Sequence, residues 1–272
     1  MPVNPGSTTG LLLRDSHLSV MRRVIGALLL REMLTRYGRN NIGFLWLFVE
    51  PTIFVAIVVI VRSFVKSVGV TLSIPVVAFA LTGWISMLLW RNMASRCIGA
   101  HKSNMSLLYH QPVTMLDVYI ARVTLEFLSI TTALVVLGVV FYLAGLSPAP
   151  ENMLQVFCAW MLFAWFGIAL GWTIGGLSEK STLVVIIWRP MSFVLMICSG
   201  IFYLADSLPH NIREVALWLP MLHALEFLRE GWFGSLFQAH YDLFYLIICN
   251  LVLTFSGLVL VRQIGTDLAD DD

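Results

Sequence analysis

The sequence predicts an all-α, polytopic membrane protein, and three observations support this prediction. Of its 272 residues, 58% are hydrophobic and only 12% are charged, whereas a soluble domain carries about 25% charged residues. Several apolar stretches are long enough to cross a bilayer as helices. The formal net charge of +1 lacks the basic excess of a nucleic-acid-binding surface. We therefore expect a protein surrounded by membrane lipids, with no nucleic-acid partner.

Six segments qualify as membrane spans. A bilayer core of about 30 Å needs about 20 mostly apolar residues in a helix. The expected spans are residues 44–65, 74–90, 118–143, 153–177, 183–203 and 243–261. They make up a single transmembrane domain over residues 1–272, and an even number of spans places both termini on the same side.

The distribution of lysine and arginine indicates which side that is. Ten basic residues would lie on the side of the termini and three on the opposite side. Because cytoplasmic loops carry the excess of Lys and Arg, both termini should be cytoplasmic. The first group is Arg14, Arg22, Arg23, Arg31, Arg36, Arg39, Arg96, Lys102, Lys180 and Arg262; the second is Lys66, Arg213 and Arg229.

Residues 18–39 have a helical pattern but too much charge to span. Glu32, Arg36 and Arg39 fall at i, i+4 and i+7, on one face of a helix. Such a helix is expected to lie in the cytoplasmic interface of the membrane. The alternative is an ordinary juxtamembrane tail.

Residues 204–242, between the fifth and sixth expected spans, form the second exception. The apolar stretch Val215–Leu228 is too short to span and is broken by Pro220. A re-entrant helical hairpin on the outer side fits this length, since backbone that turns at membrane depth must be shielded by protein. The alternative is an interfacial loop that caps the bundle. The polar or helix-breaking residues of this region are Pro220, His223, Glu226 and Arg229.

Motifs for chemistry are missing from the sequence. There is no GxxxxGK[ST], and none of the three lysines follows a glycine, so this chain is not expected to hold nucleotide phosphates. There is no HExxH, and the four cysteines are spaced singly, so neither a metal site nor another cofactor is predicted in this chain.

Ionisable residues inside the expected spans are candidates for a polar pathway. Each costs about 2.5–3.5 kcal/mol at the bilayer centre, and Arg189-Pro190 interrupts the fifth span. Arg62 and Arg91 lie near span ends, where snorkelling is an alternative. Arg122 and Glu126, at i and i+4 in the third span, are expected to pair. The full candidate pathway set, with one aromatic residue that could stack on sugar or belong to an interfacial belt, is Arg189, Arg62, Arg91, Trp84 and Glu50.

An ordered set of short motifs resembles the permeases of polysaccharide-export ABC transporters, closest to the capsular polysaccharide branch. Each motif is weak alone, but their order along the chain is specific. Leu219 departs from the asparagine that the family usually has at that position. The motifs are Leu30-Arg31-Glu32, Thr35-Arg36-Tyr37-Gly38, Ile42-Gly43-Phe44-Leu45-Trp46, Glu50-Pro51, Leu81-Thr82-Gly83-Trp84, Arg96-Cys97-Ile98-Gly99-Ala100, Ile120-Ala121-Arg122, Leu125-Glu126 and Trp218-Leu219-Pro220-Met221-Leu222-His223.

The resemblance implies a transport subunit of a type-2 ABC exporter that is not itself an enzyme. Such permeases form homodimers with two copies of a separate ATPase subunit, which binds ATP and Mg. They move lipid-linked polysaccharide across the bacterial inner membrane towards a periplasmic adaptor and an outer-membrane export protein. Residues 101–116 would be the coupling helix, and residues 204–242 would shape the outer exit. The residues implied in ATPase coupling are Arg31, Glu32, Arg36, His101, Lys102, Asn104 and His110.

Three other functions stay open at this point. An O-antigen or teichoic-acid export permease would share the family pattern. An ion-coupled secondary transporter should show inverted repeats and an acidic residue deep in a span, and the sequence displays neither. An intramembrane enzyme should have a nucleophile and a base in matching spans, and no such pair is evident.

Overall fold

The computed structural model describes residues 17–37, 42–67, 74–110 and 113–270, and every regular element within these ranges is a helix. This confirms the all-α prediction. Ten α-helices and two short 3-10 turns make up the described chain. In order they are α1 (His17–Tyr37), α2 (Ile42–Ser67), α3 (Val76–Cys97), α4 (Ala100–His110), α5 (Met115–Leu143), α6 (Met153–Lys180), α7 (Thr182–Cys198), η1 (Ala205–Ser207), α8 (His210–Ala216), α9 (Pro220–Phe233), η2 (Gly234–Leu236) and α10 (Leu243–Asp270).

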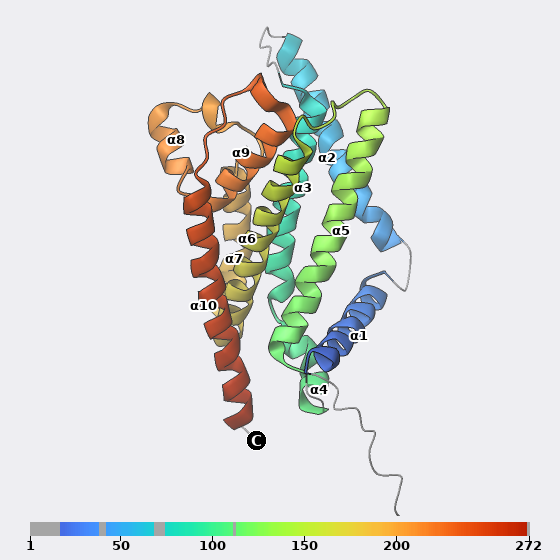
Figure 1. Ribbon diagram of the computed structural model, residues 1–272, viewed down its shortest axis with the longest axis vertical. Helices are drawn as coiled ribbons and strands as arrows, with labels where there is room; N and C mark the ends of the chain where they lie inside the picture. Colours follow the sequence, from blue (N-terminus) through green and yellow to red (C-terminus); the bar gives the residue numbers. More distant parts are fainter. Residues whose placement is uncertain (1–16, 38–41, 68–73, 111–112, 271–272) are drawn as a thin grey trace, which may run out of the picture.

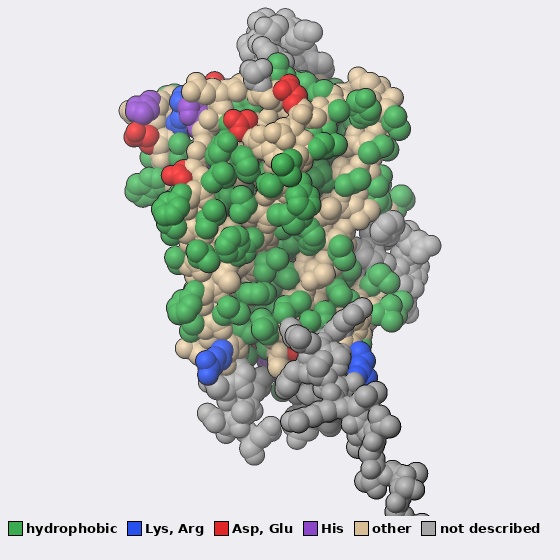
Figure 2. All heavy atoms as spheres, viewed as in Figure 1, with side chains coloured by type: hydrophobic (Ala, Val, Ile, Leu, Met, Phe, Trp, Pro, Cys, Tyr) green, Lys and Arg blue, Asp and Glu red, His purple; other side chains and the backbone are tan. Residues whose placement is uncertain are grey.

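The long helices run alternately up and down between two ends of a bundle (Figure 1). At the lower end in this view lie α1, α4 and the end of α10, and at the upper end lie α8 and α9. Charged side chains gather near these two ends, whereas the middle of the visible face is mostly hydrophobic (Figure 2). A hydrophobic band between two polar ends is the surface expected of a protein that crosses a bilayer.

Four helices are long and apolar enough to cross a membrane: Val76–Cys97, Met115–Leu143, Met153–Lys180 and Leu243–Ile264. They contain or overlap the second, third, fourth and sixth expected spans. Two shorter apolar helices, Leu45–Val61 and Thr182–Cys198, occupy the first and fifth. Helix α7 ends at Cys198 because Gly200 adopts a left-handed φ of +86° that turns the chain.

Helix α5 begins at Met115, three residues before the expected span, because a capping box fixes its first turn. The Asp117 amide donates to Thr114 Oγ1 over 3.3 Å, and the Thr114 amide donates to Asp117 Oδ2 over 2.9 Å. These two bonds satisfy amide groups that a helix start leaves free. The expected coupling segment, residues 101–116, therefore comprises most of α4 and the first two residues of α5.

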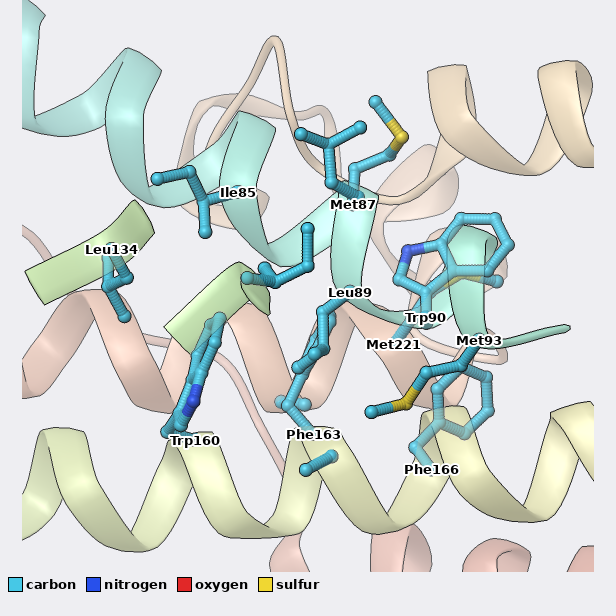
Figure 3. Packing of buried hydrophobic residues seen from close by; sticks show 14 of the residues in the cluster. Ile85, Met87, Leu89, Trp90, Met93, Leu134, Trp160, Phe163, Phe166 and Met221 are labelled. Atoms are coloured by element: carbon cyan, nitrogen blue, oxygen red, sulfur yellow. The ribbon is translucent and has the colours of Figure 1, made fainter. Parts of the chain in front are cut away.

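Helix α3 forms the centre of the bundle and is buried along most of its length. Leu89 and Met93 of α3 pack towards Phe163 and Phe166 of α6 (Figure 3). Glycines of α6 allow this approach: a Cβ at Gly167 would lie 3.2 Å from Trp90 Cα. Small residues at such crossings are typical of helix packing in membranes.

Polar side chains tie α10 to α6. Trp165 Nε1 donates to Thr254 Oγ1 over 3.0 Å, and Thr173 Oγ1 donates to the Leu253 carbonyl over 2.9 Å. Asn250, fully buried, donates from Nδ2 to the Leu162 carbonyl. Each such bond stabilises helix pairs in membranes by about 0.6 kcal/mol on average.

Helix α9 is fastened into the upper end of the bundle by Arg229, which is fully buried. Its guanidinium donates to the carbonyls of Gly200, Tyr203 and Ile201, which follow α7, over 2.7, 2.9 and 3.2 Å. It also lies 4.0 Å from the centre of the Phe79 ring on α3. One side chain thus joins α9, α3 and the chain that leaves α7.

Gly83 makes room for that guanidinium. A Cβ at position 83 would lie 2.9 Å from Arg229 Nη2 and 3.1 Å from the Ile201 carbonyl oxygen. We expect Gly83→Ala to destabilise the protein by about 1–3 kcal/mol, the usual cost of overpacking. The measurement is the temperature at which purified protein in lipid nanodiscs loses its native form.

Gly138→Ala is the matched control. It lies in α5, and a Cβ there would meet only Trp232, at an ordinary 3.6 Å. This change should be neutral or slightly stabilising, since alanine favours a helix over glycine. Equal melting temperatures for the two variants would contradict the tight fit at Gly83.

Candidate functional site

A short helix, α4, follows α3 at the lower end of the bundle and turns away from it at Gly99. Gly99 has a left-handed φ of +66°, which reverses the chain between the two helices. Two side-chain bonds hold the first turn of α4: Ser103 Oγ donates to the Gly99 carbonyl, and Asn104 Nδ2 donates to the Ala100 carbonyl. The position and direction of α4 are therefore fixed by local bonds.

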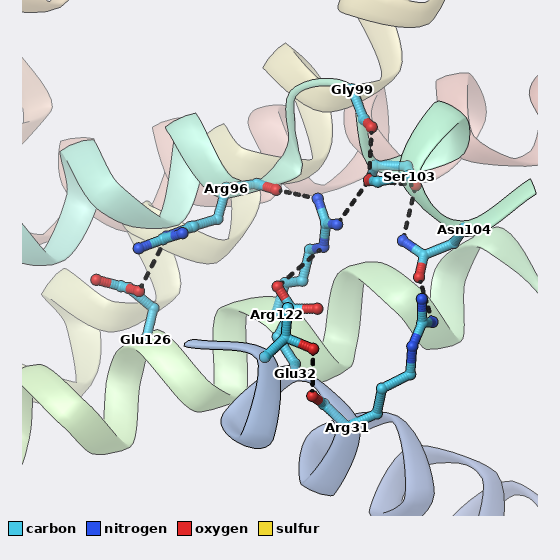
Figure 4. Close-up of polar contacts among 10 residues, drawn as sticks. Arg31, Glu32, Arg96, Gly99, Ser103, Asn104, Arg122 and Glu126 are labelled. Atoms are coloured by element: carbon cyan, nitrogen blue, oxygen red, sulfur yellow. Dashed lines mark hydrogen bonds and ion pairs between the residues drawn. The ribbon is translucent and has the colours of Figure 1, made fainter. Parts of the chain in front are cut away.

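Helix α1 contacts α4 directly. Arg31 Nη1 donates to Asn104 Oδ1 over 2.8 Å (Figure 4). Asn104 is buried, so its amide is used within the chain: one end binds α1 and the other the start of α4. Two residues of the expected coupling set thus meet across 73 positions of sequence.

Arg122 of α5 joins the same group. Its Nη1 donates to the carbonyl of Arg96 on α3 over 2.7 Å, and its Nη2 donates to Ser103 Oγ on α4 over 2.8 Å. Its Nε lies 3.6 Å from Glu32 Oε1 on α1. Figure 4 shows these contacts converging on one guanidinium.

Glu126, fully buried one turn further along α5, faces α3. Its Oε1 accepts from Asn92 Nδ2 over 2.9 Å, and its Oε2 lies 3.6 Å from Arg96 Nε. A buried carboxylate needs such partners, because leaving one uncompensated costs several kcal/mol. The sequence suggested that Arg122 and Glu126 pair with each other; the structure gives them these tertiary partners. We call the residues labelled in Figure 4 the inner polar network: Arg31, Glu32, Arg96, Gly99, Ser103, Asn104, Arg122 and Glu126.

The remaining coupling candidates are placed as follows. The His101 amide donates to Glu179 Oε1 at the end of α6 over 3.3 Å, and Lys102 is exposed. The side chains of Arg36 and His110 lie outside the described residues. Lys102 is therefore an exposed, charged side chain of α4 that another subunit could contact.

The candidate pathway residues gather partly on one face of α3. Trp84, Arg91 and Ser95 lie at i, i+7 and i+11, along one side of the helix. Phe54 of α2 stacks on Trp84 with ring centres 3.9 Å apart, and Trp188 Nε1 of α7 donates to Ser95 Oγ. Residues of α2 and of α7 thus contact this side of α3, which we call the α2–α3–α7 face.

Charge accompanies the aromatic rings on this face. Glu50 lies one turn before Phe54 on α2 and interacts electrostatically with Arg91. Phe202, just after α7, extends the ring cluster, 6.1 Å from Phe54. Aromatic rings beside charged groups suit contact with sugar rings and their polar substituents. The side chain of Arg62 lies outside the described residues.

Arg189 lies on the outward side of α7 and is exposed. The next residue, Pro190, is exposed with it, as are Ile186 and Phe193, one turn away on either side. Within the described chain, no hydrogen bond or ion pair involves its side chain. Its neighbour Trp188, by contrast, is buried against α3.

The predicted residues of the outer region hold α9 in place. Pro220 is the first residue of α9, where a missing amide hydrogen is harmless. His223 Nδ1 accepts from the Asp242 amide over 2.8 Å, and Nε2 donates to the Leu217 carbonyl. The Glu226 carboxylate accepts from the Ala205 and His240 amides. These side chains satisfy backbone groups, as Arg229 does.

An open depression of about 760 Å³ lies beside the end of α9. Within it the Glu230 carboxylate accepts from the Tyr241 hydroxyl over 2.7 Å and from Gln155 Nε2. Burial and this neighbouring carboxylate raise the pKa of Tyr241 to about 12, so its phenol stays protonated and donates. The lining is Glu151, Asn152, Gln155, Glu230, Gly234, Phe237, Gln238 and Ala239.

The chain matches the family of ABC-2 type transporters over residues 23–233. It is 42% identical over 246 residues to the capsule polysaccharide export inner-membrane protein CtrC of Neisseria meningitidis serogroup B, and 39% identical to BexB of Haemophilus influenzae, which has the same description. Both alignments cover 90% of this chain and 92% of the relative. The polysialic acid transport protein KpsM of Escherichia coli is 29% identical over 252 residues, 91% and 95% of the two chains.

The matched range contains both the inner polar network and α9 with its fastening residues. The family match begins within α1 and ends at the last residue of α9. It therefore covers the part of the molecule that holds the candidate site. This chain belongs to the ABC-2 type transporter family.

Proposed function

We propose that this chain is the transmembrane subunit of an exporter that moves lipid-linked capsular polysaccharide across the bacterial inner membrane. The observation that carries the proposal is the identity of 36–42% to five relatives named as capsule polysaccharide export inner-membrane proteins. ATP and Mg bind a separate ATPase subunit, two copies of which join two copies of this chain. The polymer then passes to a periplasmic adaptor and an outer-membrane export protein.

In this proposal six helices cross the membrane, with α2 and α7 as the first and fifth. The alternation of the six helices between the two ends of the bundle supports this layout (Figure 1). The excess of Lys and Arg at the end that carries α1 and α4 supports a cytoplasmic location for both termini. Helix α1 then lies in the inner interface, and α8 and α9 form a re-entrant hairpin at the outer side.

ATP-driven movement would enter through α4. This helix lies at the cytoplasmic end, and its exposed Lys102 can contact the ATPase. Its bonds to α1 and α5, and the bond from Arg122 of α5 to α3, connect that contact to the spanning helices. A displacement of α4 by a few ångströms would therefore reorient the bundle as a whole, because packed helices shift as rigid bodies.

The polymer pathway would run along the α2–α3–α7 face and be completed by a second copy of the chain. A guanidinium stays charged and is costly in contact with lipid tails, so the exposed Arg189 must face water, polar substrate or protein. The aromatic cluster around Trp84 offers surfaces on which sugar rings can stack.

Export of O-antigen or teichoic acid stays the runner-up, since those polymers are also lipid-linked sugars. The names of the most similar relatives favour capsular polysaccharide. Family membership also speaks against an ion-coupled secondary transporter and against an intramembrane enzyme.

The docking of α4 can be tested by a photoreactive amino acid at Lys102. Cross-linking in cells should trap the ATPase subunit, because this exposed side chain lies at the proposed cytoplasmic end. Asn104 is a poor position for the same test because it is buried against Arg31. The measurement is the mass of the cross-linked product.

Glu214 of α8 is the matched control, since it is exposed at the opposite end of the bundle. The photoreactive amino acid at this position should give no ATPase product. Labelling of a cysteine at position 102 by a membrane-impermeant reagent from the periplasm would overturn the orientation and the proposed coupling together.

Arg189 provides the test of the pathway. We expect Arg189→Ala to lower export at least several-fold per folded dimer, whereas Arg189→Lys keeps most of it because a cation remains. Export and detergent-extracted dimer are measured in the same cells. Ile186→Ala, one turn earlier on the same exposed side of α7, should leave export unchanged.

The competing role for Arg189 is structural. If Arg189 stabilises the fold, replacing it by alanine would lower the amount of folded protein and the export in equal proportion. The reason is that a charged partner would be left uncompensated. A dimer yield that falls in step with export would therefore rule out the pathway role.

A further inference from the structure

We propose that Arg122 is the positioning residue that passes a displacement of α4 to α1, α3 and α5 together. The inference rests on the proposed function. It assigns one part of that function to Arg122, which the sequence pattern had paired with Glu126. Its basis is geometric: one guanidinium on α5 contacts three other helices, at 2.7 Å to α3, 2.8 Å to α4 and 3.6 Å to α1.

The shape of the side chain explains why arginine is needed. A guanidinium is planar and presents its N–H groups in fixed directions, whereas a lysine has one flexible ammonium. Here Nη1 and Nη2 point to the Arg96 carbonyl and the Ser103 hydroxyl, and Nε faces Glu32 (Figure 4). Any shift of Ser103 relative to Arg96 must therefore rotate the guanidinium or break one of its contacts.

Ser103 is the contact on the α4 side. Its hydroxyl accepts from Arg122 and donates to the Gly99 carbonyl at the chain reversal before α4. A single hydroxyl thus joins Arg122 to the chain reversal before α4. Movement of α4 about Gly99 moves this acceptor directly.

A movement of α4 that reaches α5 would also displace the opposite end of α5. Helix α5 is continuous from Met115 to Leu143, so a tilt of its inner end displaces its outer end. There Gly138 lies against Trp232, near the end of α9. Arg122 is therefore placed to connect the cytoplasmic contact of α4 with the outer hairpin through a single rigid helix.

The neighbouring pair of Arg96 and Glu126 supplies a matched control. It belongs to the same network and is also charged, but the Arg96 side chain pairs α3 with α5 and not with α4. Arg96→Gln removes this ion pair and keeps the backbone carbonyl to which Arg122 donates. It perturbs the stability of the network without cutting the connection to α4.

The experiment measures polymer moved per ATP hydrolysed. Inverted inner-membrane vesicles contain this chain, its ATPase subunit and endogenous lipid-linked polymer; transported polymer becomes protected from added glycosidase. A merely structural residue changes the amount of intact complex and leaves this ratio unaltered. We expect Arg122→Gln and Arg122→Lys to lower the ratio about tenfold, within the usual range of coupling between sites, and Arg96→Gln to leave it unchanged.

Ser103→Ala keeps the test decisive if the Arg122 variants fold poorly. It removes the α4 acceptor by deleting one exposed hydroxyl and should lower the ratio in the same direction with near-normal yield. An unchanged ratio in Ser103→Ala, or in folded Arg122→Gln, overturns the inference. A wild-type complex that hydrolyses ATP without moving any polymer would instead refute the proposed function.

Discussion

A charged group inside an apolar bundle must find its partners within the protein, and this constraint organises the whole structure. Arg229 is the clearest case: it is fully buried and donates to three backbone carbonyls left free where the chain leaves α7. The irregular backbone at that point could not face lipid with free carbonyls. The hydrogen bonds between the guanidinium and these carbonyls therefore reduce the cost of burying both groups. The same bonds hold α9 in place.

The same constraint acts at the inner end with a different outcome. Glu126 is fully buried and has two side-chain partners on α3, and Arg122 bonds to groups of three separate helices. Two of the three Arg122 contacts, to Ser103 and Glu32, are to side chains, which can rotate. All three hydrogen bonds of Arg229 are to backbone carbonyls in a packed turn. Helix α9 is thus held by fixed backbone groups, whereas the inner polar network includes side-chain contacts that can rearrange if α4 moves as proposed.

The sequence was sufficient for the fold class because composition and the length of apolar segments follow directly from the bilayer. It also placed Arg31 and Asn104 in one functional group, through the resemblance to a known family. It missed the partners of Arg122, because spacing of i, i+4 favours Glu126 and the distance along the chain to Glu32 gives no signal. It could not show that Asn104 is buried, since that depends on where α1 packs.

Arg189 is the exception among these arginines, because no hydrogen bond or ion pair involves its side chain within the described residues. Arg229 and Arg122 are satisfied by other parts of the same described chain, whereas Arg189 is exposed among apolar residues of α7. A guanidinium left against lipid tails would be costly, and the nearby Pro190 also frees a backbone carbonyl. No hydrogen bond or ion pair in the described part of the chain gives the Arg189 side chain polar surroundings, which is why we propose that water, substrate or a second copy lies against this side of α7.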